Sequence, residues 1–181
     1  MTLWAVLAKA PKALRVYFVA QLVNTILLET AYGRVGTAMY ASLYTAGFAI
    51  IFCAMVEIVW EAVRSWPVLA VAGVLSGLIL LMASRSVPHW NEAVVVIMLE
   101  ATLLVFCTCA LAFRVPFMAD KSKRVHTALV LLWFSLAVFD FCLAARVPMT
   151  DFLNQWTPTW ALVSTMFYLG YQLRSEPMET A

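Results

Sequence analysis

Charged residues are scarce in this sequence. Only 12% of the 181 residues are Asp, Glu, Lys or Arg, whereas 64% are hydrophobic. A soluble domain has about a quarter of its residues charged and about half apolar. This chain has too little polar surface to cover a globule in water, so we expect residues 1–181 to form a single transmembrane domain in a lipid bilayer. The formal net charge of +2 gives no reason to expect a nucleic-acid partner.

Residues that usually hold metals, haem or a redox centre are also few. Of the two histidines, His89 falls in a connection on the outer side of the predicted membrane, and His126 falls at the inner end of a predicted span. They therefore cannot ligate one haem together. Cys107 and Cys109 are two residues apart, which on a helix points them about 200° away from each other. The sequence has no H-E-x-x-H motif, glycine-rich phosphate loop or nucleophile elbow. We therefore expect no enzyme, no cofactor and no resident metal.

Hydrophobic segments dominate what remains. A helix needs about 20 apolar residues to cross about 30 Å of hydrocarbon. The first candidate span is the least regular, because Gln21, Asn24 and Glu29 interrupt it. We expect an all-α bundle of six transmembrane helices whose longest soluble piece is the connection Arg114–Arg124. The predicted spans lie near residues 16–33, 37–62, 67–84, 91–113, 126–145 and 156–173.

The basic residues are unevenly divided between the two sides of the membrane that this topology defines. Lys9, Lys12, Arg15, Arg64, Arg114, Lys121, Lys123, Arg124 and Arg174 fall on the side of both termini, against Arg34, Arg85 and Arg146 on the other side. Lys and Arg favour the cytoplasmic side of a membrane. The sequence therefore predicts cytoplasmic N- and C-termini, and we expect the chain in a bacterial inner (plasma) membrane.

Prolines are absent from the interiors of the predicted spans. Four segments instead finish in an arginine followed within three residues by a proline, a pattern typical of helix ends. Broken helices, which many transporters use, are therefore not indicated. The spacing Gly73-x-x-x-Gly77 in the third segment predicts close packing of helix backbones.

Polar side chains follow one arc of the first and last predicted helices. Gln21 and Asn24 share such an arc on the first helix, and Ser164 and Tyr168 share one on the last. Lipid cannot satisfy these groups, so the arcs should face the bundle interior. Hydrogen bonding between helices and a polar cavity for a small ligand both fit this pattern.

Carboxyl groups inside the hydrophobic segments need a specific explanation. Glu100 lies near the predicted midplane, at the depth of Asn24 and Ser164, and Asp140 lies nearer to the outer surface. No basic residue reaches the depth of Glu100, so we expect its resting form to be the neutral acid. Such a residue is either a structural hydrogen-bond donor or a site that binds a proton or a cation.

Two more carboxylates, Glu57 and Glu61, lie one helical turn apart at the inner end of the second predicted span. They could chelate a metal, but we favour a solvated interfacial pair in which Arg64 is the partner of Glu61.

A functional hypothesis follows from short connections, straight helices and missing catalytic motifs. We expect a non-catalytic integral membrane subunit or sensor whose partners are the lipid bilayer and other membrane subunits or a second copy of itself. The alternative is a small proton-coupled transporter or channel with a polar interior around Glu100. A water-accessible cavity that reaches Glu100 would favour the alternative.

Overall fold

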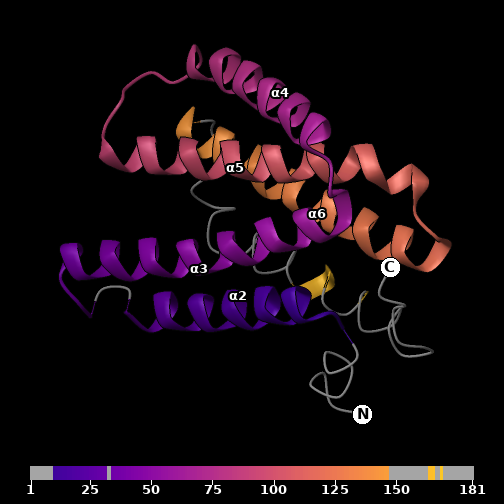
Figure 1. Ribbon diagram of the computed structural model, residues 1–181. Coiled ribbons are helices and arrows are strands. Elements are labelled where there is room, and N and C mark those ends of the chain that lie inside the picture. Colours follow the sequence, from indigo (N-terminus) through magenta and orange to yellow (C-terminus); the bar gives the residue numbers. More distant parts are fainter. Residues whose placement is uncertain (1–9, 32–33, 147–162, 166–167, 169–181) are drawn as a thin grey trace. The chain divides into compact units, whose positions relative to one another are not determined.

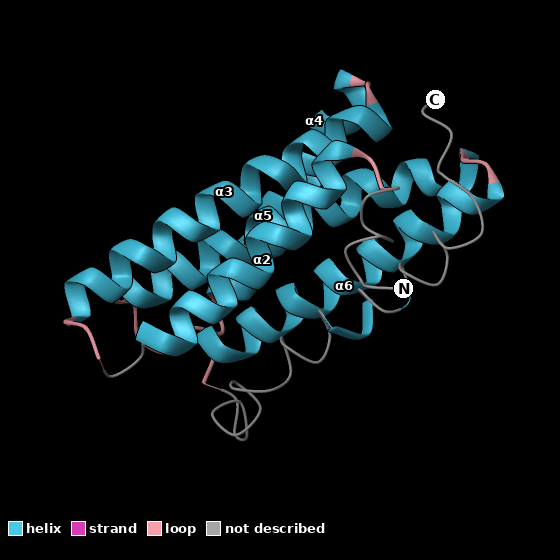
Figure 2. Ribbon diagram, turned by 90° about the horizontal axis from the view of Figure 1, so that it is seen from below, coloured by secondary structure: helices cyan, strands magenta, loops and turns pink. Residues whose placement is uncertain are grey.

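The computed structural model describes residues 10–31, 34–146, 163–165 and 168 (Figure 1). Every regular element within these residues is helical (Figure 2). The chain divides into two compact units, which we describe separately. The described residues up to Glu61 belong to unit 1 and those from Ala62 onward to unit 2. The single transmembrane domain expected over residues 1–181 stays a prediction.

Four helical segments among the described residues are long and apolar enough to cross a membrane. They are Ser42–Val63, Trp66–Ser84, Val94–Phe117 and Asp120–Ala144. The all-helical prediction is confirmed for the described residues, and these four helices are compatible with the predicted membrane location. The first predicted span coincides with a 20-residue helix that is not among these four, and most of the last predicted span lies outside the described residues.

Unit 1 contains helix α2 (Lys12–Ala31) and most of helix α3 (Thr37–Val63). The two helices meet where the side chain of Asn24 lies directly against Gly47, in space that a β-carbon at residue 47 would occupy. Glycine at this position is therefore what admits the Asn24 amide. Tyr17 and Phe18 of α2 are fully buried, and their rings are edge-to-face with centroids 5.1 Å apart.

Unit 2 contains α4 (Trp66–Ser84), α5 (Glu92–Arg114), the 3-10 turn η1 (Val115–Phe117) and α6 (Asp120–Ala144). Helix α5 packs against both α4 and α6 (Figure 1). A buried apolar cluster lies where α5 begins and α6 ends. Its buried members are Val87, Val94, Met98 and Ala144.

The arginines at the predicted helix ends have three different roles. Arg64 and Arg146 follow α3 and α6 with φ angles of 44° and 53°, in the left-handed region that stops a helix. Arg85 stays right-handed after α4. The Arg114 side chain donates a hydrogen bond of 3.2 Å from Nε to the Ala62 carbonyl oxygen, which satisfies one of the last free carbonyls of α3.

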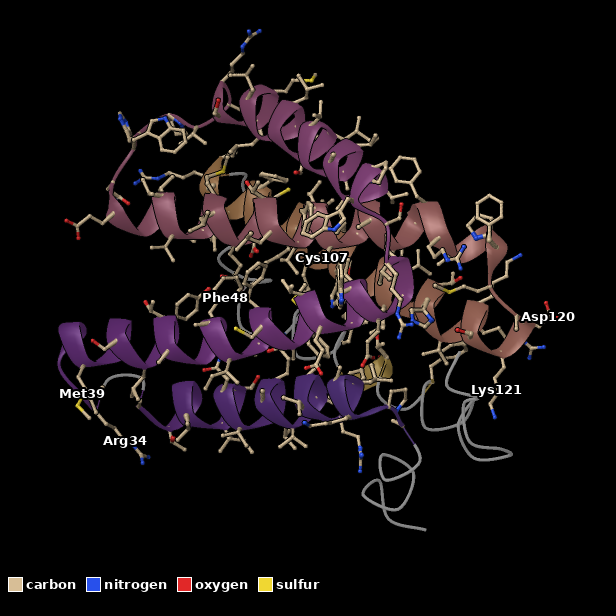
Figure 3. The ribbon with its side chains drawn as sticks, in the orientation of Figure 1. Arg34, Met39, Phe48, Cys107, Asp120 and Lys121 are labelled. Atoms are coloured by element: carbon tan, nitrogen blue, oxygen red, sulfur yellow. The ribbon has the colours of Figure 1, made fainter. Side chains whose placement is uncertain are left out.

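The start of α6 differs from the prediction. The helix begins at Asp120, before the predicted span at residue 126, and residues 115–117 form η1, so most of the expected soluble connection Arg114–Arg124 is helical. That this connection is soluble stays a prediction. Hydropathy marks where a helix enters lipid and not where it begins, and Lys, Arg and Ser are compatible with a helix. Asp120 also suits a first turn because its carboxylate faces the positive end of the helix dipole (Figure 3).

The predicted close packing at Gly73 and Gly77 is not formed among the described residues. A β-carbon at residue 73 would lie 4.0 Å from the Phe106 ring, and one at residue 77 would meet no atom within 4 Å. Both glycines are exposed, while Ala72 and Ser76 form the buried side of α4. The buried Ser76 hydroxyl donates to the Gly73 carbonyl oxygen at 3.0 Å.

Candidate functional site

Glu100 and Asp140 form the most distinctive polar feature of unit 2. Glu100 lies on α5 and Asp140 on α6, close enough for their charges to interact, and both side chains are half-buried. We name these two groups the carboxyl pair. The sequence analysis considered each carboxyl separately, whereas the packing of α5 on α6 brings them together.

The surroundings of the carboxyl pair are apolar. Ile97 lies one turn before Glu100, and Phe141 directly follows Asp140; both pack against the buried apolar cluster where α5 begins and α6 ends. Neither α5 between Glu92 and Arg114 nor α6 between His126 and Arg146 carries a lysine or arginine. The nearest Lys or Arg residues of these two helices, Arg114 on α5 and Arg124 on α6, lie more than three helical turns along the chain from the pair.

This arrangement is suited to holding one proton. At an effective dielectric constant of about 20, two unit charges about 6 Å apart repel each other by about 3 kcal/mol. A proton on either carboxyl removes this repulsion.

A second polar region lies along α6 and the last described segment. We name it the α6 groove; it has a volume of about 770 Å³. Ser164 and Tyr168, predicted to lie on a polar arc, both line it. Its other lining residues are Asp120, Lys123, Arg124, Thr127, Ala128, Leu131, Leu132, Ser135 and Thr165.

Two hydroxyl groups of the α6 groove donate hydrogen bonds to backbone carbonyl groups of their own helix. Thr127 donates from Oγ1 to the Lys123 carbonyl oxygen and Ser135 donates from Oγ to the Leu132 carbonyl oxygen, both at 2.7 Å. Each hydroxyl oxygen keeps its acceptor capacity. The groove therefore combines two cations at the beginning of α6 with weakly polar walls.

The third feature is a groove in unit 1, the α2–α3 groove, with a volume of about 890 Å³. Asn24 lines it beside Gly47, whereas Gln21 is not among its lining residues. Most of the lining is apolar, and Lys12 and Arg15 are the only charged residues among its described members.

Asn24, Glu100 and Ser164, which were predicted to lie in one layer, belong to three features that we describe separately because the first is in unit 1 and the other two are in unit 2. Asn24 lines the α2–α3 groove of unit 1, Ser164 lines the α6 groove of unit 2, and Glu100 belongs to the carboxyl pair. Glu100 lines neither groove. Predicted depth alone does not specify which helix faces meet.

Glu57 and Glu61 are both exposed on α3. Across the described ranges, no group of three or more His, Cys, Asp or Glu side chains is arranged to hold a metal ion. The interpretation of Glu57 and Glu61 as an interfacial pair stays a prediction.

Sequence reasoning missed two features of unit 2. It placed Asp140 about four residues shallower than Glu100, but four residues are only about 6 Å of helix, which is within the range of charge interaction. The other missed feature is Thr108, whose buried hydroxyl has no hydrogen-bond partner in the described part of the chain. No sequence pattern distinguishes Thr108 from Thr102, which donates to the Met98 carbonyl oxygen at 2.7 Å.

Comparisons of the whole chain with protein-family models, with curated proteins and with solved structures find no match.

Proposed function

We propose that this protein is a non-catalytic integral membrane subunit or sensor that binds a proton at the carboxyl pair and associates with other membrane components. The observation that carries this proposal is the packing of α5 on α6, which brings the half-buried Glu100 and Asp140 within range of each other's charge. Carboxyl groups at membrane depth are costly and often mark proton sites. A shared proton gives the pair two states that differ by one charge, which is what a sensor of proton concentration requires.

The proposal includes a topology of six spans with both termini in the cytoplasm, in a bacterial inner membrane. It is supported by the four apolar helices of the described residues and by the separation of basic residues along the sequence. In this topology the carboxyl pair lies in the outer half of the membrane, shielded by the apolar cluster next to it.

Infrared spectroscopy of the protein in lipid nanodiscs tests the proton site. We expect one protonated-carboxyl stretching band that belongs to the pair, and we expect E100Q and D140N each to remove this band or change its frequency. The control is E92Q, which removes an exposed carboxyl from the first turn of α5. If E100Q and D140N leave every carboxyl band of the wild type unchanged, the pair holds no proton.

Association with other membrane components is supported by α4. This helix is apolar along its length, buries little of its surface against the described part of the chain, and leaves Gly73 and Gly77 exposed there. Exposed glycines allow a second helix to approach closely. Mild detergent extraction is expected to yield an oligomer or a complex. A monodisperse monomer without any copurifying component would contradict this part of the proposal.

A second candidate function is that of a small proton-coupled transporter or channel. The carboxyl pair favours it because transport proteins relay protons through such residues. Since Glu100 lines neither groove, we rank this function second. Liposomes with an imposed pH gradient and a pH-sensitive dye inside separate the two. Transport predicts a proton flux that E100Q abolishes and E92Q preserves, whereas a sensor predicts no flux above that of empty liposomes.

A further inference from the structure

The α2–α3 groove of unit 1 has the shape and charge of a lipid site. Val16, Val19, Val23 and Leu27 of α2 line it and are exposed, so the groove is open along its side. Ala20, Ala46 and Gly47 provide short or absent side chains that hollow it between the helices. An open apolar channel of this kind receives a flexible hydrocarbon chain more readily than a compact polar solute.

The charges of the groove are confined to one end. Lys12 and Arg15 line the groove from the first turn of α2, and no Asp or Glu is among the described residues that line it. Both side chains are exposed. Two cations without a lining acid favour an anion, and arginine binds phosphate oxygens in a bidentate manner.

The length of the groove agrees with that of a lipid. Its lining on α2 extends from Lys12 to Leu27. This is about 22 Å along a helix axis at 1.5 Å per residue, compared with about 15 Å for the hydrocarbon of one leaflet. A ligand whose phosphate contacts Lys12 can therefore lay a full acyl chain past Asn24.

We propose that the α2–α3 groove binds one anionic phospholipid, with its phosphate on Lys12 and Arg15 and one acyl chain along the apolar wall. This inference is independent of the carboxyl pair, which lies in unit 2. Asn24 lines the groove about 18 Å along the helix axis from Lys12, beside the path of the acyl chain.

Native mass spectrometry of the full chain, released from micelles containing phosphatidylglycerol or phosphatidylcholine with the same acyl chains, tests this site. Two cations near an anionic headgroup contribute about 1 kcal/mol each, so we expect phosphatidylglycerol to bind about 30-fold more tightly. The double variant K12Q/R15Q should reduce this preference to about that of phosphatidylcholine. R34Q/R85Q removes the same charge from exposed arginines outside the groove and should leave the preference unchanged.

The acyl chain is tested separately. V19W fills the groove, whereas L22W places the same side chain on an exposed position of α2 outside it. We expect V19W to reduce the binding of both lipids at least tenfold and L22W to reduce neither, with helical circular dichroism unchanged in both. Equal affinity of the wild type for the two lipids, or equal effects of V19W and L22W, would overturn the proposal. Displacement by millimolar inorganic phosphate would show an anion site without a lipid and would overturn it as well.

Discussion

Single residues of α5 show how a buried hydroxyl affects stability. Thr108 is buried without a hydrogen-bond partner among the described residues, whereas Thr102 on the same helix donates to the Met98 carbonyl oxygen. An unpaired buried polar group costs about 1–3 kcal/mol, and its replacement by an apolar group of the same shape removes that cost. The two threonines therefore form a matched pair of positions.

We predict that T108V raises the free energy of unfolding by about 1 kcal/mol. The control T102V should leave it unchanged or lower it slightly, because it removes a satisfied hydrogen bond. Unfolding in mixed micelles of mild detergent and dodecyl sulfate provides the measurement. A T108V protein less stable than the wild type would show that the Thr108 hydroxyl has a partner that stabilises it.

The contact between Asn24 and Gly47 allows a test of unit 1. A β-carbon at residue 47 would overlap the Asn24 amide, so we predict that G47A destabilises the protein by about 1–3 kcal/mol. Shortening the opposing side chain should rescue it: the double variant G47A/N24A should be more stable than G47A alone. The same micelle unfolding assay measures both. Additive effects of the two substitutions would contradict a direct contact between these residues.

The helical elements show how much of the fold could be predicted from the sequence. Helices α4 and α5 begin and end within one residue of the predicted spans, because their apolar runs stop at an arginine close to a proline. The beginning of α6 could not be predicted from hydropathy, since its first turns are basic yet helical.

The pairing of Glu100 with Asp140 depends on the rotation and register of α5 against α6. A single sequence specifies the depth of each residue but not which helix faces meet. For the same reason the layer of Asn24, Glu100 and Ser164 was predicted from depth, whereas these residues belong to three separate features.

Substitutions of Arg64, at the end of α3, test how much free energy its left-handed backbone conformation costs. Arg64 has a φ of 44°, a conformation that costs about 1–2 kcal/mol for residues other than glycine. R64G and R64A both remove the charge, but only glycine removes the backbone strain. We predict that R64G is about 1 kcal/mol more stable than R64A. Equal stability of the two variants would mean that the backbone at residue 64 relaxes without cost.

At the scale of the whole molecule, the distribution of basic residues predicts the topology. Reporter fusions at the C-terminus and in the connection between α4 and α5 distinguish the two sides of the membrane. We predict fluorescence from a C-terminal green fluorescent protein and activity from alkaline phosphatase inserted after Trp90, because six spans place these points on opposite sides. Alkaline phosphatase activity at the C-terminus would contradict six spans with both termini in the cytoplasm.

The central claim about the whole molecule is that Glu100 and Asp140 share one proton. It is tested by asking whether the titration of each carboxyl depends on the presence of the other. Infrared titration in nanodiscs should be recorded for the wild type, E100Q, D140N and the double variant. If Glu100 and Asp140 share one proton, removing either carboxyl shifts the pH range over which the other titrates. If each remaining carboxyl titrates over the same range as in the wild type, the two groups are independent and the proposed proton site does not exist.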